Sequence, residues 1–84
     1  MENTKSHKLM LYNDDNHSFS YIMACLIRFC GHEPLQAEQC ATIAHHKGVC
    51  SVKSGDFLDI FEIHNDFEKL KVKTEIVEHE SSVY

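Results

Sequence analysis

The pattern of apolar and polar residues predicts six short elements in this 84-residue chain. A short apolar run ends at Tyr12 and is followed by the turn-forming residues 13–16, which predicts a strand over residues 8–12. From Phe19 to Cys30 the apolar residues recur at the spacing of one helix face. Ser18 is a suitable N-cap for this helix, and Gly31 is a suitable stop.

A second helix is predicted from Pro34, which suits a first helical turn, to Gly48. Its inward stripe consists of small residues that allow a neighbouring element to approach closely, namely Ala37, Cys40, Ala41 and Ala44. The apolar run over residues 49–52 is long enough only for a strand. A third helix then follows, with Ser54 as its expected cap and a core face expected to consist of Phe57, Ile60, Phe61 and His64.

The last predicted element is a half-exposed strand over residues 71–77, in which Val72, Thr74 and Ile76 face inward. The order of elements is strand, helix, helix, strand, helix, strand. It predicts an α+β fold, a two-layer sandwich in which a three-stranded antiparallel sheet packs against three helices. We expect one domain over residues 8–78, a short flexible arm over residues 1–7 and a C-terminal tail over residues 79–84.

Composition narrows the class of protein. Hydrophobic residues make up 43% and charged residues 25% of the chain, as in ordinary soluble domains. A net charge of −5 has the wrong sign for binding nucleic acid through its phosphates and favours a cationic partner. The chain has no apolar stretch of membrane-spanning length, and its polar start does not resemble a signal peptide. We therefore expect a cytoplasmic monomer that binds neither nucleic acid nor membrane.

The chain's cysteines and histidines raise the alternatives of a metal site and of an enzyme. Without a secretory segment, Cys25, Cys30, Cys40 and Cys50 are expected to be reduced thiols. No C-x-x-C or H-x-x-x-H pair is present, so we expect no metal or other cofactor, although a metal- or redox-responsive domain remains a third interpretation. Cys50 beside His45 or His46 could form a nucleophile and its base, but no Gly-rich loop or nucleophile elbow accompanies them. We expect a non-catalytic protein in which Cys50 points into the core.

The segment Asn13-Asp14-Asp15 has two interpretations. Asn and Asp are common in solvated turns, because their side chains hydrogen-bond to the nearby backbone. Alternatively, three side chains that accept hydrogen bonds, with no adjacent lysine or arginine, could bind a cation. His45 and His46 also have two interpretations. They could take part in binding, or they could simply lie at an exposed helix C-terminus, where histidines interact favourably with the helix dipole.

Three motifs carry a resemblance to a known family. They are "LYNDDNHSF" after the first strand, "AHHKG" at the end of the second helix and "GVCSV" entering the second strand. In this order they resemble the N-D-D, V-H-x-x-G and I-C-G-V landmarks of the ClpS adaptors, which deliver N-degron substrates to an ATP-dependent Clp protease. The resemblance extends from about Lys8 to about Val77.

The resemblance implies a site for the first residue of a substrate protein. An α-amino group is mostly cationic at neutral pH, and the residues expected to bind it are Asn13, Asp14, Asp15 and His45. A pocket for the substrate's large hydrophobic first side chain would be lined by His17, Phe19, Ile22, Ala41, Ala44, Leu70 and Val72. His45 accepts a hydrogen bond only while its ring is neutral, so the affinity is expected to fall as the imidazole becomes protonated.

The chain also departs from the family pattern. Phe19 and Ala41 stand where family members commonly carry methionines, and His17 and Ser18 replace the motif's threonine and proline. These differences change the shape of the expected pocket and leave the preferred first residue open. The implied partner is the N-terminal domain of a Clp AAA+ unfoldase. The alternative function is a ClpS-like regulatory or scaffold module with altered or lost N-degron specificity.

Overall fold

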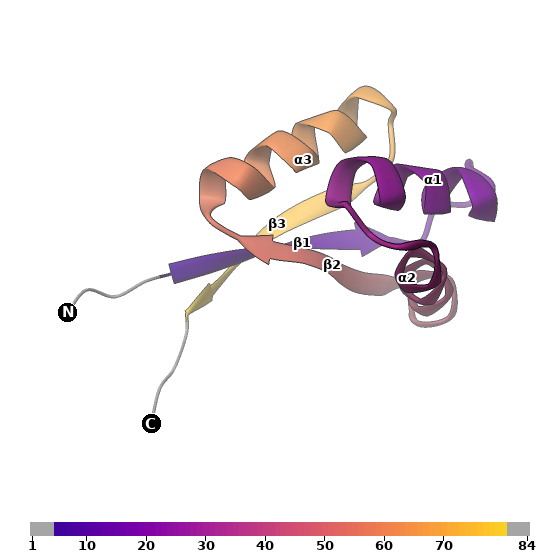
Figure 1. Ribbon diagram of the computed structural model, residues 1–84, viewed down its shortest axis with the longest axis horizontal. Coiled ribbons are helices and arrows are strands. Elements are labelled where there is room, and N and C mark those ends of the chain that lie inside the picture. Colours follow the sequence, from indigo (N-terminus) through magenta and orange to yellow (C-terminus); the bar gives the residue numbers. More distant parts are fainter. Residues whose placement is uncertain (1–4, 81–84) are drawn as a thin grey trace.

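The computed structural model describes residues 5–80 and confirms the predicted order of elements (Figure 1). The sheet is three-stranded and antiparallel, and the fold is the expected α+β arrangement of a sheet with three helices. The elements are β1 (Lys5–Tyr12), α1 (Phe19–Cys30), α2 (Pro34–Lys47), β2 (Val49–Gly55), α3 (Phe57–Lys69) and β3 (Thr74–Glu80).

The central strand of the sheet is β1, which pairs with β2 on one side and with β3 on the other. Leu11 lies opposite Cys50 of β2 and Thr74 of β3. Figure 1 shows α1 and α3 over one face of the sheet, while α2 lies near β2 and packs against both α1 and β2. The end of β1 therefore lies close to the first turn of α1 and to the last turn of α2.

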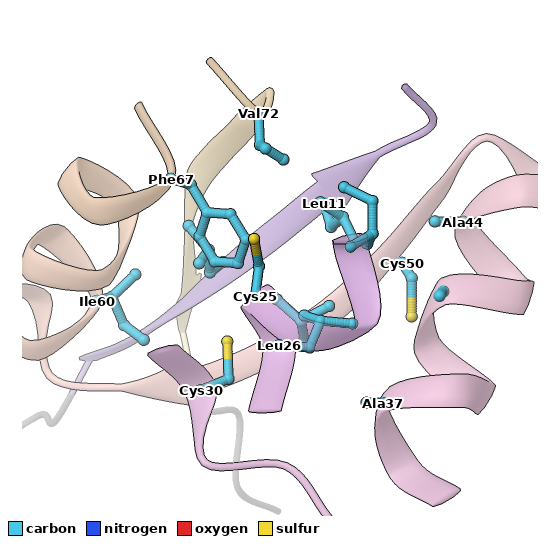
Figure 2. Close-up of a cluster of buried hydrophobic side chains, with 14 residues drawn as sticks. Leu11, Cys25, Leu26, Cys30, Ala37, Ala44, Cys50, Ile60, Phe67 and Val72 are labelled. Atoms are coloured by element: carbon cyan, nitrogen blue, oxygen red, sulfur yellow. The ribbon is translucent and has the colours of Figure 1, made fainter. Parts of the chain in front are cut away.

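The hydrophobic core lies between the sheet and its helices (Figure 2). Leu9 and Leu11 of β1 are fully buried, because successive residues of a strand point to opposite faces and these two point toward the helices. Phe67 of α3 is also fully buried, and its ring meets that of Phe29 on α1 edge to face at 5.3 Å. This aromatic contact joins the two helices above β1.

The predicted helix ends are confirmed for the first two helices. Ser18 caps α1, and its Oγ accepts a hydrogen bond from the Tyr21 backbone N–H at 3.1 Å. Gly31 and Gly48 end α1 and α2 with φ angles of 73° and 93°, a left-handed conformation that favours glycine. Pro34 is the first residue of α2, where its missing N–H has no helical partner to lose.

The third helix differs from its prediction in both its start and its buried face. Its N-cap is Asp56, because Ser54 still belongs to β2. The buried residues of α3 are Ile60 and Phe67, whereas Phe57 is 45% and Phe61 is 41% exposed. The two exposed rings stack on each other at 5.5 Å. Of the expected core face, Ile60 is fully buried and His64 is partly buried, so the prediction is wrong for Phe57 and Phe61.

The strands also differ in their bounds from those predicted. β1 begins at Lys5, three residues before the expected start, and β2 continues to Gly55. β3 begins at Thr74, because the chain turns at Lys71, whose φ is +62°. β3 then extends to Glu80. Residues 5–7, expected in the arm, therefore belong to β1, and residues 79–80, expected in the tail, belong to β3, which pairs with it. The remaining arm and tail positions, 1–4 and 81–84, lie outside the described residues.

Within residues 5–80, no helix is both long and apolar enough to span a membrane.

Candidate functional site

A backbone hydrogen bond fastens the loop after β1 to the end of α2. The N–H of Asn13 donates to the carbonyl oxygen of Gly48 at 2.9 Å. Gly48 is the C-cap of α2, and the last turn of that helix carries His45. This bond therefore brings the start of the loop at Asn13, here called the Asn13 corner, beside that turn. Segments far apart in the sequence thus meet at one end of the sheet.

A cavity of about 310 Å³ lies where this loop meets α1 and α2. Nine of the eleven residues expected at the site from the sequence line it. They are Asn13, Asp14, Asp15, His17, Phe19, Ile22, Ala41, Ala44 and His45. The structure therefore brings together residues from the β1–α1 loop, the first turn of α1 and the second half of α2.

The mouth of this cavity combines acidic, amide and imidazole groups. Asn13, Asp15 and His45 are exposed and line the cavity, so their polar atoms are accessible to a ligand. Among the described residues that line it, none is a lysine or an arginine. An ionised carboxylate and an amide oxygen can accept hydrogen bonds from a bound cation, as can a neutral imidazole nitrogen. The mouth can therefore bind a small group with positive charge and several N–H donors.

The inner wall of the cavity is apolar. Ile22, Ala41 and Ala44 are buried and line it, and Leu11 of β1 adds a fourth buried apolar side chain. Phe19, which is 44% exposed, forms a wall nearer the surface. The alanines leave space that larger side chains on α2 would fill. An apolar group that enters the cavity would therefore leave water for an apolar surface.

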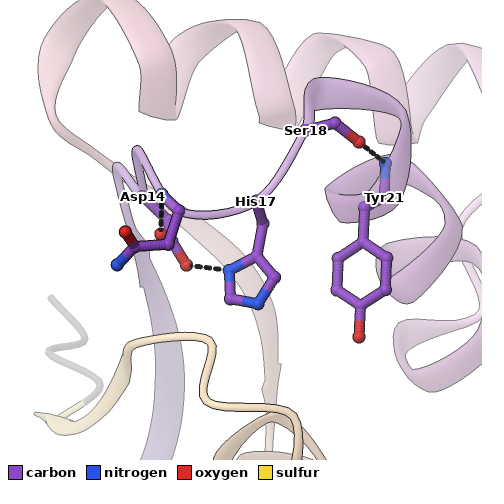
Figure 3. Close-up of polar contacts among 5 residues, drawn as sticks. Asp14, His17, Ser18 and Tyr21 are labelled. Carbon is purple, nitrogen blue, oxygen red and sulfur yellow. Dashed lines mark hydrogen bonds and ion pairs between the residues drawn. The ribbon is translucent and has the colours of Figure 1, made fainter.

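Asp14 has hydrogen-bond partners within its own loop (Figure 3). Its Oδ1 accepts from the Asn16 backbone N–H at 2.7 Å, and its Oδ2 lies 2.5 Å from His17 Nδ1. The side chain of Asp14 is only 7% exposed. Asp14 is thus less accessible to a ligand than Asn13 or Asp15.

Two residues expected at the pocket lie elsewhere. Leu70 lines a separate groove with residues of α1 such as Ala24 and Phe29. Val72 is 1% exposed in the core, where its N–H donates to the Phe67 carbonyl oxygen at 3.0 Å. The turn at Lys71 holds Val72 beneath α3, so neither side chain reaches the cavity beside α2.

Two residues at the end of β1, Leu11 and Tyr12, line the cavity although the sequence analysis did not include them. The Tyr12 hydroxyl donates a hydrogen bond to Glu75, which raises the tyrosine's pKa, and Lys73 Nζ lies 5.3 Å from the ring centroid. The position of Leu11 and Tyr12 directly before Asn13 was the available signal, because the last residues of a strand lie next to the loop that follows.

The four cysteines are free thiols, as expected. Cys50 lies in the core, and burial, together with the neighbouring Cys40, raises its pKa to about 11. Burial likewise raises the pKa of Cys30 to about 12. The Cys50 thiol therefore stays protonated at neutral pH, which argues against a thiolate nucleophile at this position. Within the described part of the chain, no three His, Cys, Asp or Glu side chains are grouped so that they could hold a metal ion.

Comparison with known proteins gives one family match. A family model described as "ATP-dependent Clp protease adaptor protein ClpS" matches residues 2–79, nearly the whole chain. A search of curated proteins finds no match. The matched range includes both the loop and the helices that form the cavity. The chain therefore belongs to the ClpS family of Clp protease adaptor proteins.

Proposed function

We propose that this protein is an adaptor that binds the free α-amino group and the bulky hydrophobic first residue of N-degron substrates. The observation that carries the proposal is a single cavity with an acidic and amide mouth and an apolar inner wall. A chain's first residue has the matching arrangement, because its ammonium group and its side chain are attached to the same carbon atom.

The ammonium group is assigned to the mouth. An α-amino group has a pKa of about 7.7–8.0 and so carries a positive charge and three N–H donors at neutral pH. Asn13 would accept through its side-chain oxygen, His45 would accept through a ring nitrogen, and Asp15 would supply negative charge. The absence of a lysine or arginine among the described lining residues leaves this charge without a competing cation inside the cavity.

The first side chain is assigned to the apolar wall. Burying a Leu- or Phe-sized side chain stabilises a complex by about 1.5–3 kcal/mol. Each hydrogen bond to a charged group adds about 1.5–3 kcal/mol. Binding to the proposed site therefore requires both groups, and an internal segment of a substrate, which lacks the ammonium, binds weakly.

Delivery is the second half of the proposal. Membership of the ClpS family supports a Clp protease as the partner, and we propose that contact is made through the N-terminal domain of its AAA+ unfoldase. In this function the protein carries substrates without chemical change to them, and we place it in the cytoplasm.

A peptide series tests the proposed pocket. The peptides are identical except for a first residue of Gly, Leu, Phe, Tyr, Trp, Ile, Val or Met, and their affinities are measured by fluorescence anisotropy. We expect at least one of the large apolar first residues to bind about tenfold or more tightly than Gly, as the burial of its side chain requires. Equal affinity across the series would show that the cavity does not receive the first side chain.

A further inference from the structure

His17 and Asp14 both line the cavity and form a close pair. Figure 3 shows this pair. His17 Nδ1 lies 2.5 Å from Asp14 Oδ2, and the second carboxylate oxygen accepts from the Asn16 N–H at 2.7 Å. An ionised carboxylate can only accept hydrogen bonds, so His17 is the donor and carries a proton on Nδ1. Both partners are largely enclosed, with 19% of the His17 side chain and 7% of the Asp14 side chain exposed.

A second contact fixes the orientation of the His17 ring. It stacks on the Tyr21 ring of α1, with the centroids 5.0 Å apart and the planes 13° from parallel. The backbone N–H of Tyr21 donates to Ser18, which caps α1 in the same turn. The imidazole is thus held between the loop and the helix, and its Nδ1–H points at the carboxylate.

We propose that His17 is a positioning residue that holds the Asp14 carboxylate at the mouth and, by gaining a proton, lowers the negative charge offered to the substrate's ammonium group. This inference rests on the proposed function of the cavity. An ionised carboxylate has about four lone-pair sites, and the loop uses two of those on Asp14, so the carboxylate can still attract and accept from an ammonium group.

The sign of the effect follows from the charges. With His17 neutral, the pair has a charge of about −1, and with His17 protonated it has a charge of about zero. A bound ammonium is attracted by the first state and gains little from the second. Among the described residues, the other ionisable groups that line the cavity are Asp15 of the loop, Tyr12 of β1 and His45 of α2, and Tyr21 of α1 stacks on His17. Protonation of His45 acts in the same direction, so the test must separate the two histidines.

The substitution His17→Asn makes this separation. The asparagine side-chain nitrogen can donate to Asp14 from nearly the position of Nδ1, but it does not titrate. The affinity of a Phe-first peptide is measured at about pH 7.5 and about pH 5.5, a range in which histidine changes charge and the peptide's ammonium stays mostly protonated. Each protein's loss of affinity is taken between its own two pH values, so the comparison does not require equal affinities at the higher pH.

At the lower pH the wild type is expected to lose at least about threefold more affinity than His17→Asn. The reason is that a protonated His17 places a positive charge near the bound ammonium, and the asparagine does not. His45 is present in both proteins, so its contribution cancels in the comparison. Asp14→Asn provides a second variant, which removes the carboxylate that His17 holds. We expect it to bind at least about tenfold more weakly than the wild type at the higher pH, and equal affinity of the two proteins would contradict the role of Asp14.

Equal losses in the wild type and His17→Asn would overturn the inference while leaving the proposed function intact. Absence of wild-type binding to every peptide of the first-residue series at the higher pH would overturn both. Thermal unfolding of each variant at both pH values shows whether it is folded. If His17→Asn is unfolded, His17→Gln, whose side-chain amide also donates without titrating, takes its place in the same comparison with the wild type.

Discussion

Replacing Phe67 with alanine should lower the free energy of unfolding by about 3–5 kcal/mol, the usual cost of removing a buried phenylalanine ring. Phe67 is fully buried, and its ring contacts Phe29 across the α1–α3 contact above the sheet. Small domains are stable by only about 5–15 kcal/mol, so a loss of this size removes a large fraction of the stability. Urea unfolding followed by circular dichroism measures the change.

Phe61→Ala is the matched control, because it removes the same ring from the same helix at a position that is 41% exposed. We expect it to cost less than about 1.5 kcal/mol, since much of this ring remains in contact with water in the folded protein. Equal losses in the two variants would contradict the assignment of the buried face of α3 to Ile60 and Phe67.

Replacing His45 with alanine should weaken the binding of a Phe-first peptide by at least about tenfold. The expected loss is that of one hydrogen bond to a charged group, about 1.5–3 kcal/mol. His45 lines the mouth of the cavity at the end of α2, next to the Asn13 corner. Its side chain is exposed, so the stability of the fold should change little. Isothermal titration calorimetry at neutral pH measures the affinity.

His46→Ala controls for the removal of an imidazole from the same helix end. His46 is also exposed and its ring touches that of His45, but it does not line the cavity. We expect its affinity to stay within about twofold of the wild type, as is usual for a surface change away from the site. A larger loss of affinity in His46→Ala than in His45→Ala would contradict the placement of the ammonium site beside the Asn13 corner.

The order of elements was predictable because the local signals agree with the tertiary structure. Ser18, Gly31 and Gly48 mark helix ends through backbone chemistry that depends only on neighbouring residues. The face of α3 was not predictable in this way, because the helix has two apolar stripes. One contains Phe57 and Phe61, the other Ile60 and Phe67, and both have helical spacing. Only packing against β1 and α1 decides which stripe is buried.

The site was predictable in part for a similar reason. The acceptors at Asn13 and Asp15 lie in the loop that follows the first strand. The motif resemblance indicated that His45 belongs to the same site. In the structure, the Asn13–Gly48 hydrogen bond places His45 near this loop. Val72 was expected at the pocket from the resemblance, and residues 71–77 were expected to form one strand because they alternate. The true position of Val72 depends on the left-handed turn at Lys71, which the sequence does not reveal.

The pairing of His17 with Asp14 was not predictable either. It depends on side-chain geometry and on the stacking of His17 with Tyr21, and no local rule of sequence fixes such contacts.

The most direct test of an ammonium site joined to an apolar pocket is calorimetry of the wild type with one Phe-first peptide in two forms, one with a free α-amino group and one acetylated. Acetylation removes the charge and two of the donors and leaves the side chain intact. We expect it to weaken binding by at least about tenfold, which corresponds to the loss of one or more charged hydrogen bonds. Equal affinity for the two forms would contradict the ammonium site and favour a ClpS-like scaffold that does not recognise chain termini.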